Sequence, residues 1–199
     1  PEQKRWSPTG TGTAVADLIE RQRETETVLE SAPSYWRRHD VTALPTGFRE
    51  RLADLAGGEV VRATETRPSR AVREIERRLD DADSVSVITP IYNERFDHAV
   101  RGEDLRLVLD TGVLEDLLDE EDTEESDGDV GAVRVADVPF AVAVTDECVL
   151  LSLPTLDGAY DPRTEFVAES ERAQQWGMEL FEHYWADALS PEEFLAVRR

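Results

Sequence analysis

The first periodic stretch of the chain is a helix with a polar middle. Between Ala14 and Glu30, apolar residues recur near each end at the i, i+3, i+4 spacing of an amphipathic helix: Val15, Leu18, Ile19, Val28 and Leu29. The preceding Gly10–Thr13 stretch is a helix start signal. Because each apolar stripe is thin, the pattern predicts a connector or a dimer helix, with Val15, Leu18 and Ile19 as candidate interface residues.

The middle of the chain alternates between short apolar runs and helical periodicity. After a helix opened by Pro45 and closed by Gly57-Gly58, the pattern predicts strand Glu59–Ala63, helix Ser69–Asp80, strand Ser84–Ile88, a helix near Glu94–Val100, strand Asp104–Leu109 and helix Gly112–Leu118. Crossovers of this length favour parallel pairing of the strands. We therefore expect a partly parallel sheet that is covered by helices on at least one face.

The last third of the chain has a different order of elements. Extended runs are predicted at Ala132–Ala136, Phe140–Thr145 and Cys148–Leu153, followed by a short strand at Glu165–Val167. A tight hairpin at Thr145-Asp146-Glu147 makes the sheet end antiparallel. From Glu171 a long helix carries an aromatic and aliphatic stripe, which predicts either core or dimer interface: Trp176, Leu180, Phe181 and Tyr184. A short helix starts at Pro191.

Together these elements predict an α/β fold. We expect a mixed, partly parallel sheet covered by helices, with an N-terminal linker helix and a long C-terminal amphipathic helix. A length of 199 residues favours one domain, or one domain plus an appended segment, and we divide the chain into residues 1–30 and 31–199. The acidic stretch 119–129 has no apolar residue and does not match the spacing of a calcium loop, so we expect a solvated loop.

Charge and composition indicate the environment of the protein. The chain has 44 acidic and 22 basic residues, and Lys4 is the one lysine among the basic residues. A densely carboxylated surface stays hydrated in molar salt, where like charges are screened, so we expect a halophilic archaeal protein. The single Cys148 cannot form an intramolecular disulfide, and no apolar run is long enough to span a bilayer. We expect a cytoplasmic protein without a membrane partner.

Motifs that mark common active sites are missing from the sequence. There is no GxSxG nucleophile turn and no Gly-rich phosphate loop, and Lys4 leaves no lysine for Schiff-base chemistry in the folded body. His39, His98 and His183 are far apart and lie near no acidic or cysteine spacing that is typical of a metal site. We expect no enzymatic activity, no catalytic residue, no metal and no cofactor.

The expected architecture nevertheless indicates where a ligand would bind. In sheets of this kind, ligands bind beyond the carboxyl ends of the parallel strands, and those ends carry hydroxyl and carboxyl groups. The candidate effector-binding residues are Thr89, Tyr92, His98, Asp110 and Thr111. Thr89 and Asp110 have an alternative role, because both residue types cap helices. A small hydrolase or transferase that uses Asp110, His98 and Tyr92 is a further alternative.

Several segments resemble one family. They are Ser34–Val41, Glu59–Arg62, Ser86–Tyr92, Val138–Asp146 and Gln175–Phe181. In these segments the chain resembles the C-terminal domain of archaeal winged-helix transcription regulators that are similar to the methanogenesis regulator FilR. The resemblance extends from about Ala14 to Leu189.

The resemblance implies an effector-sensing and dimerisation domain of a transcription regulator. Residues 4–10 are similar to the closing strand of a wing, and 13–30 to a linker helix, whereas the recognition helix is not in this sequence. A homodimer and a small-molecule effector are therefore the expected partners. DNA would be bound only through an upstream winged helix, since the chain shows no Lys/Arg stripe for phosphates. A stand-alone interaction module that uses the helix Ala173–Trp185 is the alternative.

Overall fold

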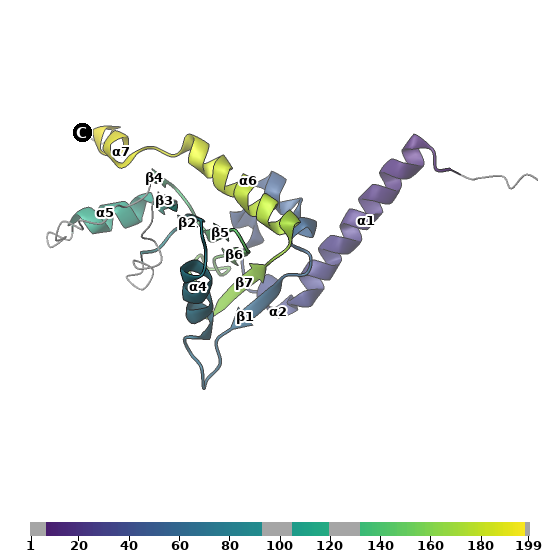
Figure 1. Ribbon diagram of the computed structural model, residues 1–199, viewed down its shortest axis with the longest axis horizontal. Helices are drawn as coiled ribbons and strands as arrows, with labels where there is room; N and C mark the ends of the chain where they lie inside the picture. The colour runs from purple at the N-terminus through teal and green to yellow at the C-terminus, as the bar shows by residue number, and fades with distance from the viewer. Residues whose placement is uncertain (1–6, 93–104, 120–131, 198–199) are drawn as a thin grey trace, which may run out of the picture.

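The computed structural model describes residues 7–92, 105–119 and 132–197. The described residues form a seven-stranded mixed sheet with the order β1-β7-β6-β5-β2-β3-β4 (Figure 1). The strands are β1 Glu59–Arg62, β2 Val85–Thr89, β3 Leu105–Asp110, β4 Ala132–Ala136, β5 Ala141–Thr145, β6 Val149–Ser152 and β7 Thr164–Ala168. The expected α/β class with a partly parallel sheet is confirmed.

Parallel and antiparallel pairings occupy different halves of the sheet. β2, β3 and β4 are parallel, and the 21 residues between β3 and β4 begin with helix α5, Thr111–Asp119. β5 and β6 form the expected hairpin, in which the Thr145 hydroxyl accepts hydrogen bonds from the backbone N–H groups of Glu147 and Cys148. The antiparallel end of the sheet follows from this tight turn.

The first strand differs from the expected parallel arrangement. β1 lies at the far edge of the sheet and pairs antiparallel with β7, so that Val61 is opposite Glu165. The strand β4, for which no partner was predicted, pairs parallel with β3. Strand neighbours are set by tertiary packing, which a local apolar run does not specify.

Helix α6, Glu171–Asp187, covers one face of the sheet (Figure 1). Trp176, Leu180 and Phe181 have no exposed surface and form the larger core with α1, α2 and the strands. Gly177 permits the close approach, because a Cβ at this position would lie 2.6 Å from Val149 Cγ2. Burying this stripe against the sheet is the main reason that α6 forms where it does.

Helix α4, Arg70–Asp80, packs against the opposite face of the sheet (Figure 1). Its buried side is made by Ala71, Ile75 and Leu79, which recur every four residues. Ile75 and Leu79 belong to a smaller core with Leu150 and other apolar residues of the sheet. The two faces of the sheet are therefore covered very differently, by α6 and its neighbours on one side and by α4 on the other.

Helix α1, Gly10–Ser31, projects from the body of the molecule (Figure 1). Its Val28 is the buried residue, and the Trp36 indole N–H donates to the Val28 carbonyl at 3.0 Å. The helix begins earlier than expected, because the Thr9 side chain caps it by accepting from the Gly12 N–H. The Gly10–Thr13 stretch is thus the first turn of α1.

The remaining described elements are short. They are α2 Pro33–Trp36, η1 Val41–Ala43, α3 Thr46–Arg49, η2 Leu52–Leu55 and α7 Pro191–Val197. The single helix expected after Pro45 is divided into α3 and η2. Beyond α6, Leu189 exchanges two backbone hydrogen bonds with Val135, which covers part of the edge strand β4. The helix expected near 94–100 and residues 120–129 of the acidic stretch lie outside the described residues, and Asp119 ends α5.

Candidate functional site

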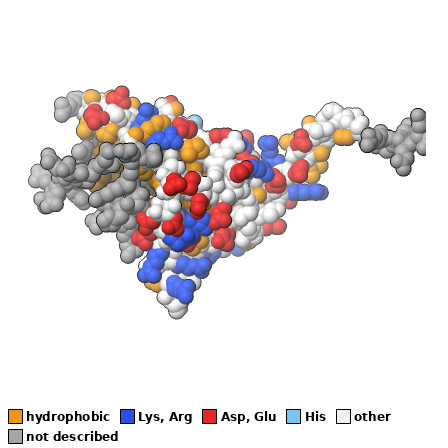
Figure 2. Space-filling view, viewed as in Figure 1, with side chains coloured by type: hydrophobic (Ala, Val, Ile, Leu, Met, Phe, Trp, Pro, Cys, Tyr) orange, Lys and Arg blue, Asp and Glu red, His pale blue; other side chains and the backbone are white. Residues whose placement is uncertain are grey.

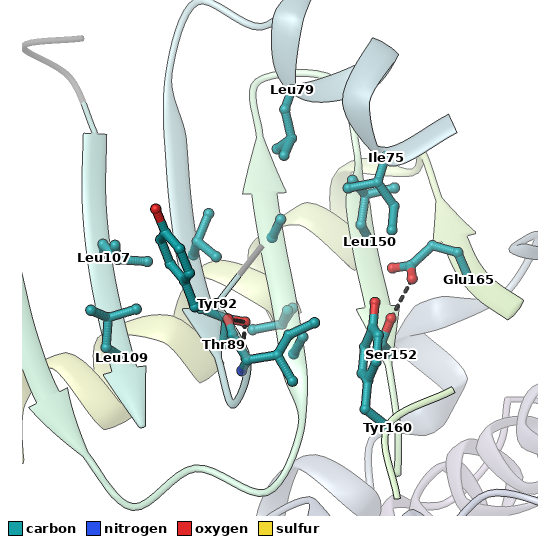
Figure 3. A pocket seen from close by; sticks show the side chains of 15 residues that line it. Ile75, Leu79, Thr89, Tyr92, Leu107, Leu109, Leu150, Ser152, Tyr160 and Glu165 are labelled. Atoms are coloured by element: carbon teal, nitrogen blue, oxygen red, sulfur yellow. Dashed lines mark hydrogen bonds between the residues drawn. The ribbon is translucent and has the colours of Figure 1, made fainter. Parts of the chain in front are cut away.

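A cavity of about 110 Å³ lies between α4 and the sheet (Figure 3). Ile75 and Leu79 of α4 line one side of it, and residues of β2, β3, β5, β6 and β7 line the other. The apolar lining on the sheet includes Val87, Leu107, Ala143 and Leu150. Cavities that are mainly apolar and carry a few polar groups at one side are typical of small-molecule sites.

One end of the cavity holds a buried carboxyl group, that of Glu165 on β7. Glu165 is 2% exposed, and the Ser152 hydroxyl of β6 donates a hydrogen bond to its Oε2 (Figure 3). Burial raises the pKa of Glu165 from 4.5 to about 8, and the hydrogen bond from Ser152 offsets only part of this effect. The carboxyl group is therefore protonated at neutral pH.

Tyr160 extends the polar end of the cavity beside Ser152 (Figure 3). It lies in the connection between β6 and β7. Burial raises the pKa of its hydroxyl to about 12, with a smaller contribution from the nearby Glu165. Tyr160 and Glu165 thus present O–H groups, without a net charge, at the same end of an apolar cavity.

A second hollow of about 420 Å³ lies beyond the carboxyl ends of β2 and β3. Its lining includes Pro90, Asp110 and Phe140. Ser152 and Tyr160 line both this hollow and the cavity beneath α4. The polar end of the cavity is therefore next to the edge of the sheet where ligands were expected from the topology.

The structure divides the candidate effector residues among several places. Thr89 and Tyr92 line the cavity beneath α4, whereas Asp110 lines the second hollow. Thr111 faces neither of them, because its hydroxyl donates to Asp137 at 2.8 Å. His98 lies outside the described residues. The expected set is thus only partly brought together.

Thr89 and Asp110 also have local structural roles. The Thr89 hydroxyl accepts from the Ile91 N–H and donates to the Ile91 carbonyl, which closes the turn after β2. Asp110 accepts from the N–H of Gly112 at 2.9 Å, at the start of α5, and from the N–H of Val138 at 3.0 Å. The capping role expected as an alternative describes Asp110 well.

The sequence did not predict Glu165, Ser152 or Tyr160 as site residues. Glu165 was expected only as part of a strand, and among 44 acidic residues a single carboxylate is not distinctive. In the structure, Glu165 is followed by the apolar pair Phe166-Val167 in a strand that is buried at four of its five positions. A charged residue inside such a strand indicates a specific function or a partner.

The polar groups of the cavity differ from those of an activated serine. A protonated Glu165 donates a hydrogen bond but cannot accept the proton of Ser152, so the pair lacks the base that activates a serine. His39 lies 2.9 Å from the Tyr35 carbonyl and 3.3 Å from an Asp161 oxygen, and His183 packs on Phe48. Among the described residues, no group of His, Cys, Asp and Glu is arranged to hold a metal ion.

The candidate interface residues fall into two groups. Val15, Leu18 and Ile19 are 49%, 67% and 47% exposed on α1. In contrast, Trp176, Leu180 and Phe181 are buried in the core of their own chain, and Tyr184 is half-buried beside Phe140. The stripe of α6 is therefore core. The alternative of a dimer interface does not hold for the three buried residues, because they already pack against the sheet of their own chain.

Arginines gather near the start of α4, where Figure 2 shows a positive surface at the lower end of the molecule. Arg67, Arg70 and Arg73 are exposed there, and none of them forms an ion pair with a described residue. Arg70, Arg73 and Arg77 have the spacing of one helix face. Arg77 on this face is paired with Glu74 and Asp81, so the expected lack of a stripe able to neutralise phosphates stays a prediction.

The fold and the cavity define an α/β domain with a small apolar site. Residues 68–187 match the family model described as the middle domain of the methanogenesis regulatory protein FilR1. The match covers more than half of the chain, which therefore belongs to this family. The resemblance found in the sequence is confirmed at the level of the family.

One characterised relative is the methanogenesis regulatory protein FilR1 of Methanothrix harundinacea (strain 6Ac). The two sequences are 29% identical over 177 residues, which cover 78% of this chain and 38% of the relative. The chain thus spans about two fifths of the length of that protein. In the described part of the chain, no helix is long and apolar enough to cross a membrane.

Two solved structures are similar in outline. TrmBL2, an archaeal chromatin protein whose structure shows a novel mode of DNA binding, has 16% sequence identity and a TM-score of 0.49, over 89% of this chain and 65% of that chain. NucT from Helicobacter pylori has 9% identity and a TM-score of 0.48, over 67% of this chain and 98% of that chain.

Proposed function

We propose that this chain is the effector-sensing and dimerisation part of an archaeal transcription regulator. An upstream winged helix would bind the DNA, and the cavity beneath α4 would bind a small-molecule effector. The observation that carries the proposal is Glu165, a buried carboxyl group that faces an apolar cavity in a chain of a regulatory family. The protein would act in the cytoplasm of a halophile, in keeping with its charge of −22.

Binding is better supported than catalysis. The alternative enzyme would use Asp110, His98 and Tyr92, but both carboxylate oxygens of Asp110 accept backbone hydrogen bonds. Both oxygens of this side chain are therefore engaged in holding the local backbone. The name of the FilR1 relative also describes a regulator and not an enzyme.

Dimerisation would occur through α1. Val15, Leu18 and Ile19 lie on one face of a helix that projects from the body, and a second copy of α1 would cover them. Apolar residues at this spacing are typical of helix–helix interfaces. The alternative of an interaction module based on α6 is less well supported, because the stripe of α6 is already buried.

The helix α1 is connected to the sensing domain at its C-terminal end. Val28 is buried in the larger core, and Glu24 forms hydrogen bonds with Arg172 near the start of α6. A ligand that favours one arrangement of the sheet and its helices would therefore change the geometry of α1. This is how an effector would alter DNA binding by the upstream domain.

A thermal-shift screen of small metabolites in molar KCl tests the sensing role. A ligand at a concentration one hundred times its Kd stabilises the folded state by about 2.7 kcal/mol, which raises the Tm by roughly 5 to 10 °C. Ala143→Leu places three more carbons in the cavity, so it should abolish the shift. Ala132→Leu makes the same change at an exposed position of β4 and should retain it.

The outcome of the screen is decisive in both directions. Ligands that stabilise the wild type and the Ala132→Leu variant but not Ala143→Leu support the proposal. Stabilisation that is equal in all three proteins, or no stabilisation by any metabolite, contradicts an effector cavity.

The DNA-binding role has its own test, because an in-frame stop codon directly upstream of the codon for Pro1 in the gene would exclude an upstream winged helix.

A further inference from the structure

The lining of the cavity beneath α4 carries information about the charge of its ligand. No Lys, Arg or His is among the described residues that line it. An anionic ligand would therefore lose its hydration without gaining a cationic partner, and it would enter a chain with a formal charge of −22. The described lining therefore disfavours anions such as carboxylates and phosphates.

A cationic ligand is also disfavoured. It would require Glu165 to ionise in an apolar cavity where the Ser152 hydroxyl is its hydrogen-bond donor among the described residues. An ammonium group needs several acceptors, and the Thr89 hydroxyl, which already donates to and accepts from the backbone of Ile91, has one lone pair left to offer. Burying a pair of charges with few hydrogen bonds costs more than it returns.

The other titratable groups around Glu165 do not supply a free charge to pair with a charged ligand. From the β6–β7 connection and from α2, Tyr160 and Tyr35 lie near it, and burial raises the pKa of both hydroxyls. Asp161, in the loop before β7, places a negative charge near Tyr160 and helps to raise its pKa. Arg62 of β1 places a positive charge near Tyr35, which acts in the opposite direction on the pKa of that residue. On α4, Arg77 and Arg78 are paired with carboxylates, which are Glu74, Asp81 and Glu169.

The size and shape of the cavity limit the body of the ligand. A volume of about 110 Å³ is smaller than the roughly 150 Å³ that accommodates the six carbons of benzene, which limits the apolar body to about four or five non-hydrogen atoms. Lining residues come from β7 at one end and β3 at the other, with β6, β5 and β2 between them (Figure 3). At about 4.8 Å per strand, a ligand of this size beside Glu165 covers about two strand spacings, from β7 to β5, and this elongated outline favours an extended chain over a ring.

We propose, on the basis of the sensing role above, that the cavity binds a small neutral molecule with a short apolar chain and a hydrogen-bond acceptor at one end. The acceptor is a carbonyl or ether oxygen, which receives the hydrogen bond of the Glu165 carboxyl group. Tyr160, whose hydroxyl is hydrogen-bonded to Ser152, lies at the same end, and the chain lies along the sheet between Leu150 and Ala143. The polar end faces the second hollow through Ser152 and Tyr160.

Three six-carbon probes of different charge test this ligand class: 2-hexanone, hexanoate and hexylammonium. Their Kd values are measured at pH 7 in molar KCl by titrations followed by protein NMR. We expect 2-hexanone to bind at least tenfold more tightly than either ion. We also expect its affinity to fall about fivefold between pH 7 and pH 9 as the donor proton of Glu165 is lost.

Variants of Glu165 identify the interaction. Glu165→Gln retains an N–H donor, so its affinity for 2-hexanone should be independent of pH between 7 and 9. Glu165→Leu should weaken binding at pH 7 about fivefold, and Glu59→Gln, at an exposed position of β1, should behave as the wild type. The melting temperature of each variant checks that it folds.

The outcomes separate this proposal from the function on which it rests. Tighter binding of hexylammonium or hexanoate than of 2-hexanone overturns the neutral class and leaves the sensing cavity intact. The same holds if Glu165→Leu binds 2-hexanone as tightly as the wild type. Failure of all three probes to bind contradicts both this ligand class and the effector cavity.

Discussion

Arg172 on α6 holds Glu24 on α1 by two hydrogen bonds of 3.2 and 3.1 Å, one from each Nη atom to a different carboxylate oxygen. The same Arg172 also donates to Asp54 of η2 at 2.9 Å. The Arg172 side chain therefore links α1 to η2 and to its own helix, α6. The contact offers a direct way to test how firmly α1 is attached.

We predict that Arg172→Gln frees the adjoining part of α1 without unfolding the protein. The side chains of Arg172 and Glu24 are 54% and 34% exposed, so the free energy of unfolding should fall by less than about 1 kcal/mol. Amide hydrogen exchange of residues 20–28 should become faster. Arg77→Gln, which breaks ion pairs within α4 at a similarly exposed side chain, should leave exchange in α1 unchanged.

The buried carboxyl group makes stability depend on pH. The pKa of Glu165 is about 8 in the folded protein and 4.5 ordinarily, so between these values the folded state binds one more proton than the unfolded state. Stability contributed by the protonated group is fully present below pH 4.5 and is lost as pH rises through about 8. The loss amounts to at most about 1.4 kcal/mol per pH unit, on the order of 5 kcal/mol in total.

Urea denaturation of Glu165→Gln at several pH values measures this effect. Between pH 5.5 and 8.5, the wild type should lose stability relative to the variant, whereas Glu59→Gln should follow the wild type throughout. Parallel curves for the wild type and Glu165→Gln would show that Glu165 titrates normally.

Close packing of α6 on the sheet predicts the effect of a methyl group at Gly177. An added Cβ would lie 2.6 Å from Val149 Cγ2 and 3.0 Å from Val144 Cγ2. We expect Gly177→Ala to lower the free energy of unfolding by about 1 to 3 kcal/mol, despite the better helix propensity of Ala. Gly47→Ala, in a helix with open space at this position, should not destabilise the protein in the same urea titration.

The dimer proposal predicts that a charge on α1 separates the subunits. Leu18 is 67% exposed, and a second copy of α1 would bury it at the proposed interface. Leu18→Glu should raise the dimer Kd at least a hundredfold, because two leucines per dimer lose a burial of about 1.5 to 3 kcal/mol each.

Sedimentation in molar KCl provides the measurement. The wild type should sediment as a dimer and Leu18→Glu as a monomer. Leu156 is 70% exposed in the β6–β7 connection, so Leu156→Glu is a matched control that should remain dimeric. A wild-type monomer, or equal weakening by both changes, would exclude an α1 interface.

Local pattern predicted most elements but not their neighbours. The stripe of α6 and the alternation around α4 have helical periods that do not depend on the rest of the chain, and both helices lie where they were expected. The pairing of β1 with β7 depends on contacts between residues that are about 100 positions apart, such as Val61 and Glu165. No local signal specifies such a pairing.

The same distinction applies to the candidate site. Thr89 and Asp110 were found because the ends of parallel strands can be located from the sequence. Glu165 was missed because its importance comes from burial, and the sequence does not distinguish a buried carboxyl group from the many exposed ones. Ser152 and Tyr160 become site residues only through their position beside it.

Methyl NMR during a ligand titration tests the central claim, that a small molecule enters the cavity beneath α4. With either 2-hexanone or hexylammonium, whichever binds, the shifts should be saturable and confined to methyl groups that line the cavity, including those of Ile75, Leu79 and Leu150. Val149, Leu151 and Leu180 belong to the core on the opposite face and serve as internal controls. Saturable shifts on the α4 side alone are the result we predict, whereas shifts centred on the α6 side, or none with either probe, would contradict the account.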